Sequence, residues 1–284
     1  MFEELGRGLD NLVKRMTSGT TLTQIDPKTD VVSVDYPPVS PVKLRLEIAI
    51  GKLNVVPGGE RLVDGMATYN VQEWAPEVGV EGDKVTVKQG HGWLLWPIWG
   101  SMRNEWELKL GTTRPYELYV TKGVAQGKLA LGGLPLTSAQ IDTGTGEATI
   151  SFDSPNPEQA DQVAIKSGTG EVQVDGLLNA NAKSVSVKSG TGRVQLGFTG
   201  ERLGQDTSAD ISLGVGEAVI EIKPGIPARI SISQGLGNAR VLGNFTAVGE
   251  HAYETPDFAG AAGPKLTMKI GSGVGSVTVR AAAS

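Results

Sequence analysis

The phrases that most resemble a chemical site are three Gly-Thr-Gly tripeptides, at residues 144–146, 168–170 and 190–192. Glycine-rich loops of this kind cradle a phosphate when a Lys-Ser/Thr pair or a helix follows them, as in Walker and dinucleotide-binding loops. Here each phrase is followed by an alternating apolar run that is typical of a β-strand. The context therefore favours a sharp corner between two strands, where glycine takes positive φ without a steric penalty.

Few other residues have the types and spacing that catalysis requires. The two histidines, His91 and His251, have no second His at ligand spacing, and the chain has no cysteine. Disulfides and thiolate chemistry are thereby excluded, and a zinc site has no support. Thr143, Ser167 and Ser189 share one repeat position, but a hydroxyl without an adjacent base is not an activated nucleophile. We expect no catalytic residue, no metal site and no cofactor.

Carboxylates recur at the position after the second glycine of the repeat, as Glu147, Glu171 and Glu217, with Arg193 between the last two. Paired carboxylates would suit a glycosidase-like reaction. An arginine within the ladder favours a solvated, charged face over a catalytic pair.

The Gly-Thr-Gly phrases belong to an internal repeat with weaker copies at 214–216, 235–237 and 273–275. The second glycines are 21 to 24 residues apart, except for a last interval of 38. Repeats of about 20 to 50 residues indicate a solenoid or a propeller. Because a propeller blade needs roughly twice this period, the sequence predicts stacked β coils, one to each repeat.

Apolar residues flank each phrase at fixed positions. Three residues before the first glycine stand Ile141, Ile165, Val187, Ile211, Ile232 and Ile270. Two and four residues after the second glycine stand the pairs Ala148/Ile150, Val172/Val174, Val194/Leu196, Ala218/Ile220, Ala239/Val241 and Val277/Val279. This period of two predicts strands with one buried face.

Composition restricts the classes of partner. The 284-residue chain has a net charge of −5 and no basic cluster, so we expect no nucleic-acid partner. No run of 18 apolar residues and no signal-peptide pattern occurs. The expected location is therefore the cytoplasm, either free or peripheral at the inner face of the membrane.

Residues 1–17 have the pattern of an amphipathic helix. Its apolar stripe contains Phe2, Leu5, Leu9, Leu12 and Met16. Three roles remain open for it: a cap on the coil, an in-plane membrane anchor or an oligomer contact. Residues 18–42 are expected to form an extended linker, because Pro27, Pro37, Pro38 and Pro41 disfavour ladder positions. Residues 43–284 are expected to form the β-solenoid domain.

The sequence 90–100 contains three of the five tryptophans, Trp93, Trp96 and Trp99. It is either a plug buried against the coil, a membrane-interface segment or a stacking platform for a sugar or a protein. Residues 244–264 form an insertion that accounts for the long last interval. We expect this insertion to cover the last rungs or, alternatively, to bind a ligand.

Five motifs together resemble the toast-rack domain of LiaF-like envelope-stress proteins and adhesin-like relatives. They are Ile48-Ala49-Ile50-Gly51-Lys52-Leu53-Asn54-Val55, Asn104-x-Trp106-x-Leu108-x-Leu110, the segment 123–136, the Gly-Thr-Gly rungs, and the segment 270–279. The resemblance covers roughly residues 43–282 and implies a single-stranded right-handed β-helix without enzymatic activity. Such domains often accompany transmembrane helices; this sequence has none, which leaves residues 1–17 as the one candidate tether.

Three functions are compatible with these observations. The first is a non-enzymatic scaffold linked to bacterial envelope stress, with a protein partner or self-assembly and peripheral membrane contact through residues 1–17. The second is a carbohydrate-binding or carbohydrate-cleaving β-helix that combines Trp93, Trp96 or Trp99 with carboxylates. The third is an adhesin-like protein that assembles through its coil ends.

Overall fold

The computed structural model describes residues 24–90 and 102–282. The elements are β1 (Gln24–Val34), β2 (Val42–Gly59), β3 (Val63–Val71), a 3-10 helix η1 (Gln72–Trp74), β4 (Pro76–Glu81), β5 (Lys84–Gln89), β6 (Asn104–Gly111), β7 (Tyr116–Ala130), β8 (Leu136–Ser151), β9 (Ala160–Asp175), β10 (Ala182–Phe198), β11 (Thr207–Ile222), β12 (Ala228–Leu242), β13 (Thr246–Gly249), β14 (Ala252–Glu254) and β15 (Leu266–Ala281). The helix expected over residues 1–17 lies outside the described residues, and no α-helix occurs within them.

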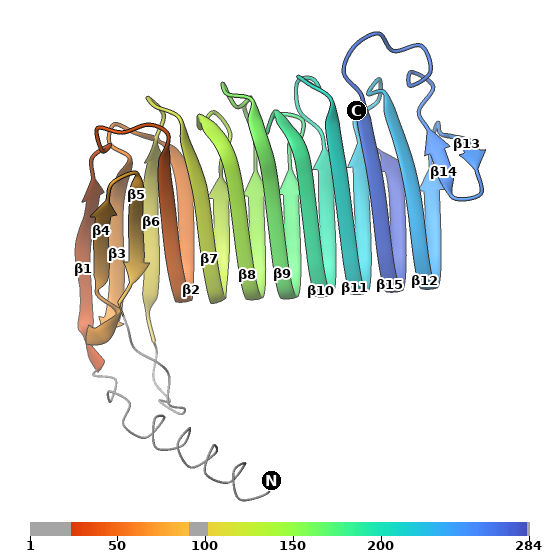
Figure 1. Ribbon diagram of the computed structural model, residues 1–284. Helices are drawn as coiled ribbons and strands as arrows, with labels where there is room; N and C mark the ends of the chain where they lie inside the picture. Colours follow the sequence, from red (N-terminus) through yellow and green to blue (C-terminus); the bar gives the residue numbers. More distant parts are fainter. Residues whose placement is uncertain (1–23, 91–101, 283–284) are drawn as a thin grey trace, which may run out of the picture.

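Each long strand from β7 to β12, together with β15, is one rung that bends at its middle. Figure 1 shows these strands doubling back along the lower edge, so that each contributes to two facing walls. Neighbouring rungs pair in parallel and in register through the bend, as Thr169 with Thr191 and Gly170 with Gly192. The strands form one sheet that does not close on itself. This arrangement is consistent with the predicted β-solenoid.

The second glycine of each Gly-x-Gly phrase makes the bend. Gly170 and Gly192 have φ of 140° and 137°, a region that residues with a Cβ rarely adopt. A Cβ on Gly192 would also lie 1.8 Å from the carbonyl oxygen of Gly170 in the neighbouring rung. The prediction of a glycine corner is confirmed, because both the dihedral angle and the close approach require this residue.

The alternating apolar residues face the interior between the walls. Those before the bend are all buried: Ile141, Ile165, Val187, Ile211, Ile232 and Ile270. Those after the bend are buried in every rung except β12, where Ala239 is exposed and Val241 is half-buried. Each buried valine or isoleucine contributes about 1.5–3 kcal/mol of transfer free energy, so the interior columns are the main stabilising element.

The order of rungs in space departs from the order in sequence. The final strand, β15, lies between β11 and β12, so that β12 is the outermost rung. The insertion 244–264 supplies the chain that makes this return possible. Part of the insertion, β13 and β14, pairs with β12 as an antiparallel hairpin beyond the last rung (Figure 1).

The opposite end is formed by β1 to β6. β2 lies between β6 and β7, and β3 and β1 continue the sheet by antiparallel pairing. β1 occupies part of the segment 18–42, in which its Val31–Val34 run pairs with Val63–Met66 of β3. β4 and β5 form a further antiparallel pair, which joins β2 through β5. The coil is thus covered by several strands at this end.

Candidate functional site

The side chains predicted to form an interaction surface lie in two segments outside the described residues. One segment contains Trp93, Trp96 and Trp99, and also His91; the other contains Phe2, Leu5, Leu9, Leu12 and Met16. The described residues that lead into these segments are Gln24 for the first 23 residues, and Gly90 and Met102 for residues 91–101.

The points where the two segments join the described structure lie close together. Gln24 is the register partner of Val71, and the Asn70 N–H donates to the Arg103 carbonyl at 3.0 Å. The Gly90 N–H donates to the carbonyl of Ala75, just beyond η1, at 3.0 Å. Both segments therefore leave from one corner of the molecule.

This corner rests on a small apolar cluster. Tyr69, Val71 and Trp74 are buried there, and Ile25 and Ile50 pack against them. An open groove of ≈ 390 Å³ lies at the same corner. Two of its lining residues, Met102 and Val124, are 38% and 62% exposed. The corner therefore offers apolar surface beside the residue at which segment 91–101 rejoins the sheet.

A buried polar network fixes the strands behind this corner. Trp106 Nε1 donates to Asn104 Oδ1 at 2.8 Å, and Asn104 Nδ2 donates to Gln89 Oε1 at 3.0 Å. Gln89 Oε1 also accepts from the Ala49 N–H at 3.0 Å. Because buried polar groups destabilise a fold when they have no partner, this network joins β2, β5 and β6 into one support.

A polar column runs inside the bend, parallel to the apolar columns. Thr143 pairs with Ser167, and Ser167 with Ser189, as their shared repeat position predicts. Lys122 of β7 precedes Thr143 in this column and is 2% exposed. Its Nζ donates to the Glu147 carbonyl at 3.1 Å. Burial lowers the pKa of Lys122 from 10.5 to about 8.

The hydroxyls of this column are not arranged for nucleophilic catalysis. Ser167 and Ser189 are buried, and their Oγ atoms have no hydrogen-bond partner among the described residues. A nucleophile needs both an adjacent base and access to substrate. The column is therefore part of the interior packing of the bend.

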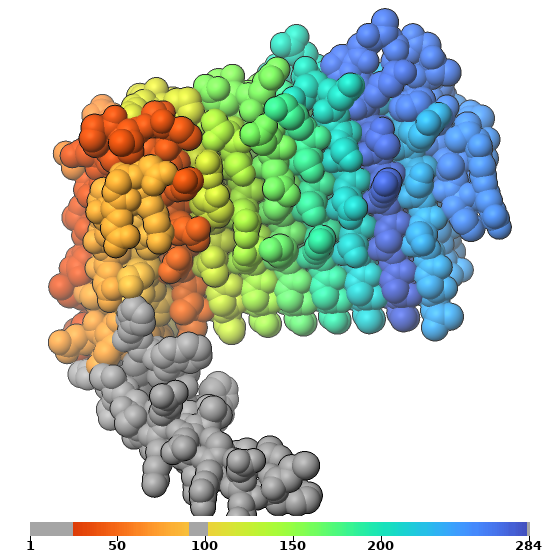
Figure 2. Space-filling view, viewed as in Figure 1, coloured from red at the N-terminus to blue at the C-terminus, as the bar shows by residue number. Residues whose placement is uncertain are grey.

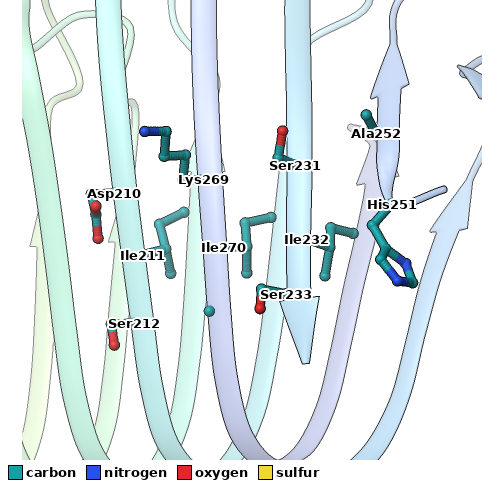
Figure 3. A pocket seen from close by; sticks show the side chains of 11 residues that line it. Asp210, Ile211, Ser212, Ser231, Ile232, Ser233, His251, Ala252, Lys269 and Ile270 are labelled. Carbon is teal, nitrogen blue, oxygen red and sulfur yellow. The ribbon is translucent and has the colours of Figure 1, made fainter. Parts of the chain in front are cut away.

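A shallow open groove of ≈ 490 Å³ lies at the other end of the solenoid. Figure 3 shows its residues in rows that cross β11, β15 and β12, with His251 at the margin. One row contains Asp210, Lys269, Ser231 and Ala252, which are successive register partners. The floor includes Gly271, whose missing side chain leaves the backbone accessible.

The groove holds charged and hydroxyl side chains without a catalytic arrangement. His251 Nε2 is 4.0 Å from Glu250 Oε1, and both side chains are largely exposed. Across residues 24–90 and 102–282, no group of three or more His, Asp or Glu side chains could hold a metal ion. No aromatic residue other than His251 is among the lining residues of the groove.

The outer edge of β12 is open beyond this groove. On β12, β14 pairs only with Arg229–Ser231, and the Ile232 N–H donates to the His251 carbonyl at 2.9 Å. Among the described residues, Ser233–Leu242 pair with β15 alone. Leu236 and Leu242 on this stretch are 71% and 51% exposed. We call the outer side of residues 233–242 the open edge.

The predicted charge ladder lies on the outside of the second wall. Glu147, Glu171, Arg193 and Glu217 are successive register partners in β8 to β11. Arg193 Nε lies 3.2 Å from Glu217 Oε2, and both side chains are substantially exposed. Exposed pairs of this kind contribute roughly 0–1 kcal/mol, which agrees with a solvated face.

Sequence reasoning missed Lys122 and the open edge. Lys122 aligns with Thr143, but its phrase, Gly123-Val124-Ala125, has lost the second glycine, so the repeat is hard to recognise there. The open edge did leave a signal, the 38-residue interval between Gly237 and Gly275. The interval alone does not tell which of the two flanking strands becomes the last rung.

A comparison with protein families finds a match over residues 23–175, more than half of the chain, to the N-terminal domain of toast_rack, DUF2154. No curated protein matches the chain. Within the part of the chain that the structure describes, no helix has the length and apolarity needed to cross a membrane.

Several solved structures have a similar chain path. One, titled a "putative cell adhesion protein" from Clostridium sporogenes ATCC 15579, has 22% identity and a TM-score of 0.49, covering 90% of this chain and 100% of that one. Another, titled a "putative adhesin" from Bacteroides fragilis NCTC 9343, has 11% identity and a TM-score of 0.42, covering 90% of this chain and 97% of that one. At these identities and TM-scores, neither structure supports an inference about what this chain binds.

Proposed function

The chain belongs to the toast_rack family, and from this membership we propose that it is a non-enzymatic β-solenoid scaffold whose contacts are made at the ends of the coil. The two walls are lined outside by polar residues that pair with one another from rung to rung, such as Arg193 with Glu217 and Arg280 with Glu221. The ends, in contrast, carry exposed apolar side chains such as Val31, Val78 and Leu242 and the unpaired edge of β12.

The observation that carries the proposal is the common origin of two apolar segments. Residues 1–23 and 91–101 both leave from the corner formed by Gln24, Gly90 and Met102. The first contains an apolar stripe at helical spacing and the second contains three tryptophans. Tryptophan and amphipathic stripes both favour the membrane–water interface. In the proposal, they act together as one peripheral membrane contact at the N-terminal end.

Co-sedimentation with vesicles tests this contact. Full-length protein is mixed with vesicles of phosphatidylethanolamine and phosphatidylglycerol, and the pelleted fraction is measured. We expect the wild type to pellet with the vesicles. Two triple variants, Trp93/Trp96/Trp99→Ser and Leu5/Leu9/Leu12→Ser, are each expected to lose most of the pelleting, because each removes the apolar area that enters the interface.

A control variant removes apolar side chains elsewhere. Val215, Val274 and Leu236 are 49%, 46% and 71% exposed and stand at the bends of β11, β15 and β12. Changing these three to Ser should leave vesicle binding unchanged. Negligible pelleting of the wild type, or equal losses in the control and the two test variants, would remove membrane contact at this end from the proposal.

A link to envelope-stress signalling is the finer part of the proposal and rests on the family resemblance alone. In that role, the solenoid holds a membrane surface at one end and a protein partner at the other. An adhesin-like role uses the same two ends and differs in the identity of the surface that is bound. The vesicle assay contains lipid and this protein alone, without any partner protein. Pelleting under these conditions therefore separates membrane contact from adhesion to another cell surface.

A further inference from the structure

In the second half of β12, an interior column of the described solenoid ends in solvent. Its inward positions, Ala239 and Val241, are in register with Val277 and Val279 of β15. Those two valines are both 0% exposed, whereas Ala239 is exposed and Val241 is half-buried. The repeat thus continues in sequence, but no further rung covers it on this wall.

The peptide groups of the same residues face outward along the coil. In a β-strand, the directions of the side chain and of the peptide N–H alternate together. Ile232 has its side chain inside and directs its N–H toward the hairpin, to the His251 carbonyl. After the bend, both the chain direction and the direction of the interior reverse, so inward-facing Ala239 and Val241 direct their N–H and C=O groups toward the same end.

The outer side of this half of β12 is therefore an unpaired strand edge. Every second residue there, Ala239 and then Val241, combines outward-facing backbone hydrogen-bonding groups with an inward-facing apolar side chain. We propose that the open edge of β12 binds an extended segment of a partner protein by strand addition, with Ala239 and Val241 supplying the backbone hydrogen bonds. This inference deepens the proposed scaffold function by naming the chemistry of the protein partner at the C-terminal end. Main-chain pairing of this kind supplies affinity, while alternate side chains supply specificity.

The hairpin favours a single strand over a second copy of the chain. β13 and β14 extend the first wall by two strands past β12, which is about 10 Å at the usual strand spacing. Figure 1 and Figure 2 show this hairpin projecting past the last rung. A second two-walled coil would meet the hairpin before its own edge reached the second wall. A single extended segment, in contrast, needs space only beside the second wall, which the hairpin does not extend.

Charge indicates which segment fits. Arg240 stands between Ala239 and Val241 on the outer face, and its side chain has no acidic partner among the described residues. Elsewhere in this molecule, neighbouring rungs bring arginine against glutamate, as in Arg193–Glu217 and Arg280–Glu221. Opposite charges across a strand pair contribute roughly 0.2–1 kcal/mol. The partner segment is therefore expected to alternate apolar residues with carboxylates.

A peptide with this pattern exists in the chain itself and serves as the probe. Residues 216–223 alternate inward Ala218 and Ile220 with outward Glu217 and Glu221. A fluorescein-labelled synthetic copy is titrated with the full-length protein, and its anisotropy is measured. A matched peptide with both Glu→Lys changes is the charge control. We expect saturable binding of the first peptide and weaker binding of the second.

Two variants of the protein locate the contact. Ala239→Pro removes an N–H that faces outward, so the pairing with β15 is retained while peptide binding is lost. Arg240→Glu is expected to weaken binding about tenfold. Lys188→Glu changes the net charge equally on an exposed position of the first wall and should leave binding unchanged. Thermal unfolding confirms that each variant is folded.

Three outcomes would overturn the inference. The first is no binding of the acidic peptide to the wild type. The second is binding that Ala239→Pro and Arg240→Glu leave intact. The third is a wild-type dimer in light scattering that Ala239→Pro converts to a monomer, which would assign the edge to a second copy. Vesicle pelleting depends on the opposite end, so the membrane contact and the strand addition can fail independently.

Discussion

The two ends of this coil share the same rung chemistry and differ in what covers it. At the N-terminal end, β5 and β6 pair with β2, β1, β3 and β4 extend the sheet further, and Trp106 of β6 is 1% exposed. At the C-terminal end, the hairpin covers the first half of β12 alone, and Ala239 is exposed. A repeat defines the inside of a solenoid well, but it leaves each end as a strand edge that separate elements must cover.

The difference also extends to the polar column inside the bend. At one end of this column, Lys122 is buried and donates to the Glu147 carbonyl. At the other end of the same register row, which Leu213 of β11 interrupts, stands Gln234, half-buried, which donates to the Gly275 carbonyl at 2.8 Å. Both long side chains satisfy a carbonyl of the neighbouring rung. This hydrogen bond is therefore buried at Lys122 and partly hydrated at Gln234.

The largest expected effect compares two corner glycines. Gly192→Ala places a Cβ 1.8 Å from the Gly170 carbonyl oxygen, between two paired rungs. Gly237→Ala places one 1.7 Å from the Gly275 carbonyl oxygen, but in the outermost rung. We expect Gly192→Ala to cost more than about 4 kcal/mol of unfolding free energy. Gly237→Ala should cost less than half of that, because the open edge can move away.

Urea unfolding followed by circular dichroism measures both variants. Equal losses at the two positions would mean that the outermost rung is held as firmly as an inner one. In that case, the distinction between the covered and the open end would not be energetic.

The next effect concerns one buried and one exposed apolar residue. Trp106→Ala removes a side chain that is 1% exposed and donates to Asn104, so we expect a loss of about 3–5 kcal/mol. Leu236→Ala removes a side chain that is 71% exposed, and its effect should stay within about 0.5 kcal/mol. Thermal unfolding of both variants makes the comparison. A large loss for Leu236→Ala would show that the open edge is covered in solution.

The third effect is a pH dependence at Lys122. Burial lowers its pKa from 10.5 to about 8 in the folded state. Between these values the unfolded state binds more protons than the folded state, so this group makes stability rise with pH. Below about pH 8 the full penalty is present. Lys122→Met should therefore stabilise the protein at pH 7, by at most about 3 kcal/mol, and the gain should shrink toward pH 10.5.

Gln234→Met is the control for this experiment. It replaces the side chain at the matching position of the outermost rung, and it should cost about 1 kcal/mol through the lost hydrogen bond, independently of pH. Unfolding free energies of both variants between pH 7 and pH 10 test the expectation. If the gain from Lys122→Met did not depend on pH, the ammonium of Lys122 would not be desolvated as its burial indicates.

Much of the fold could be predicted because its determinants are local. The repeated rungs, the buried columns and the corner glycines follow from alternation and from the backbone freedom of glycine. The candidate contacts were harder to predict. The interaction residues expected at Trp93, Trp96 and Trp99 lie outside the described part of the chain. The open edge was not foreseen, because Ala239 and Val241 follow the same pattern as their buried counterparts.

The sequence by itself determined the rung: which residues face inward, where the chain bends, and that rungs stack at one to each repeat. These are properties of a few adjacent residues, because side-chain alternation and positive φ act within one strand. The tertiary structure alone decided the order of the rungs, with β15 between β11 and β12 and β2 beside β7. Order depends on which strand edge remains free when distant segments pair. For the same reason, only the tertiary structure shows that β12 ends the coil and that Ala239 has no rung above it.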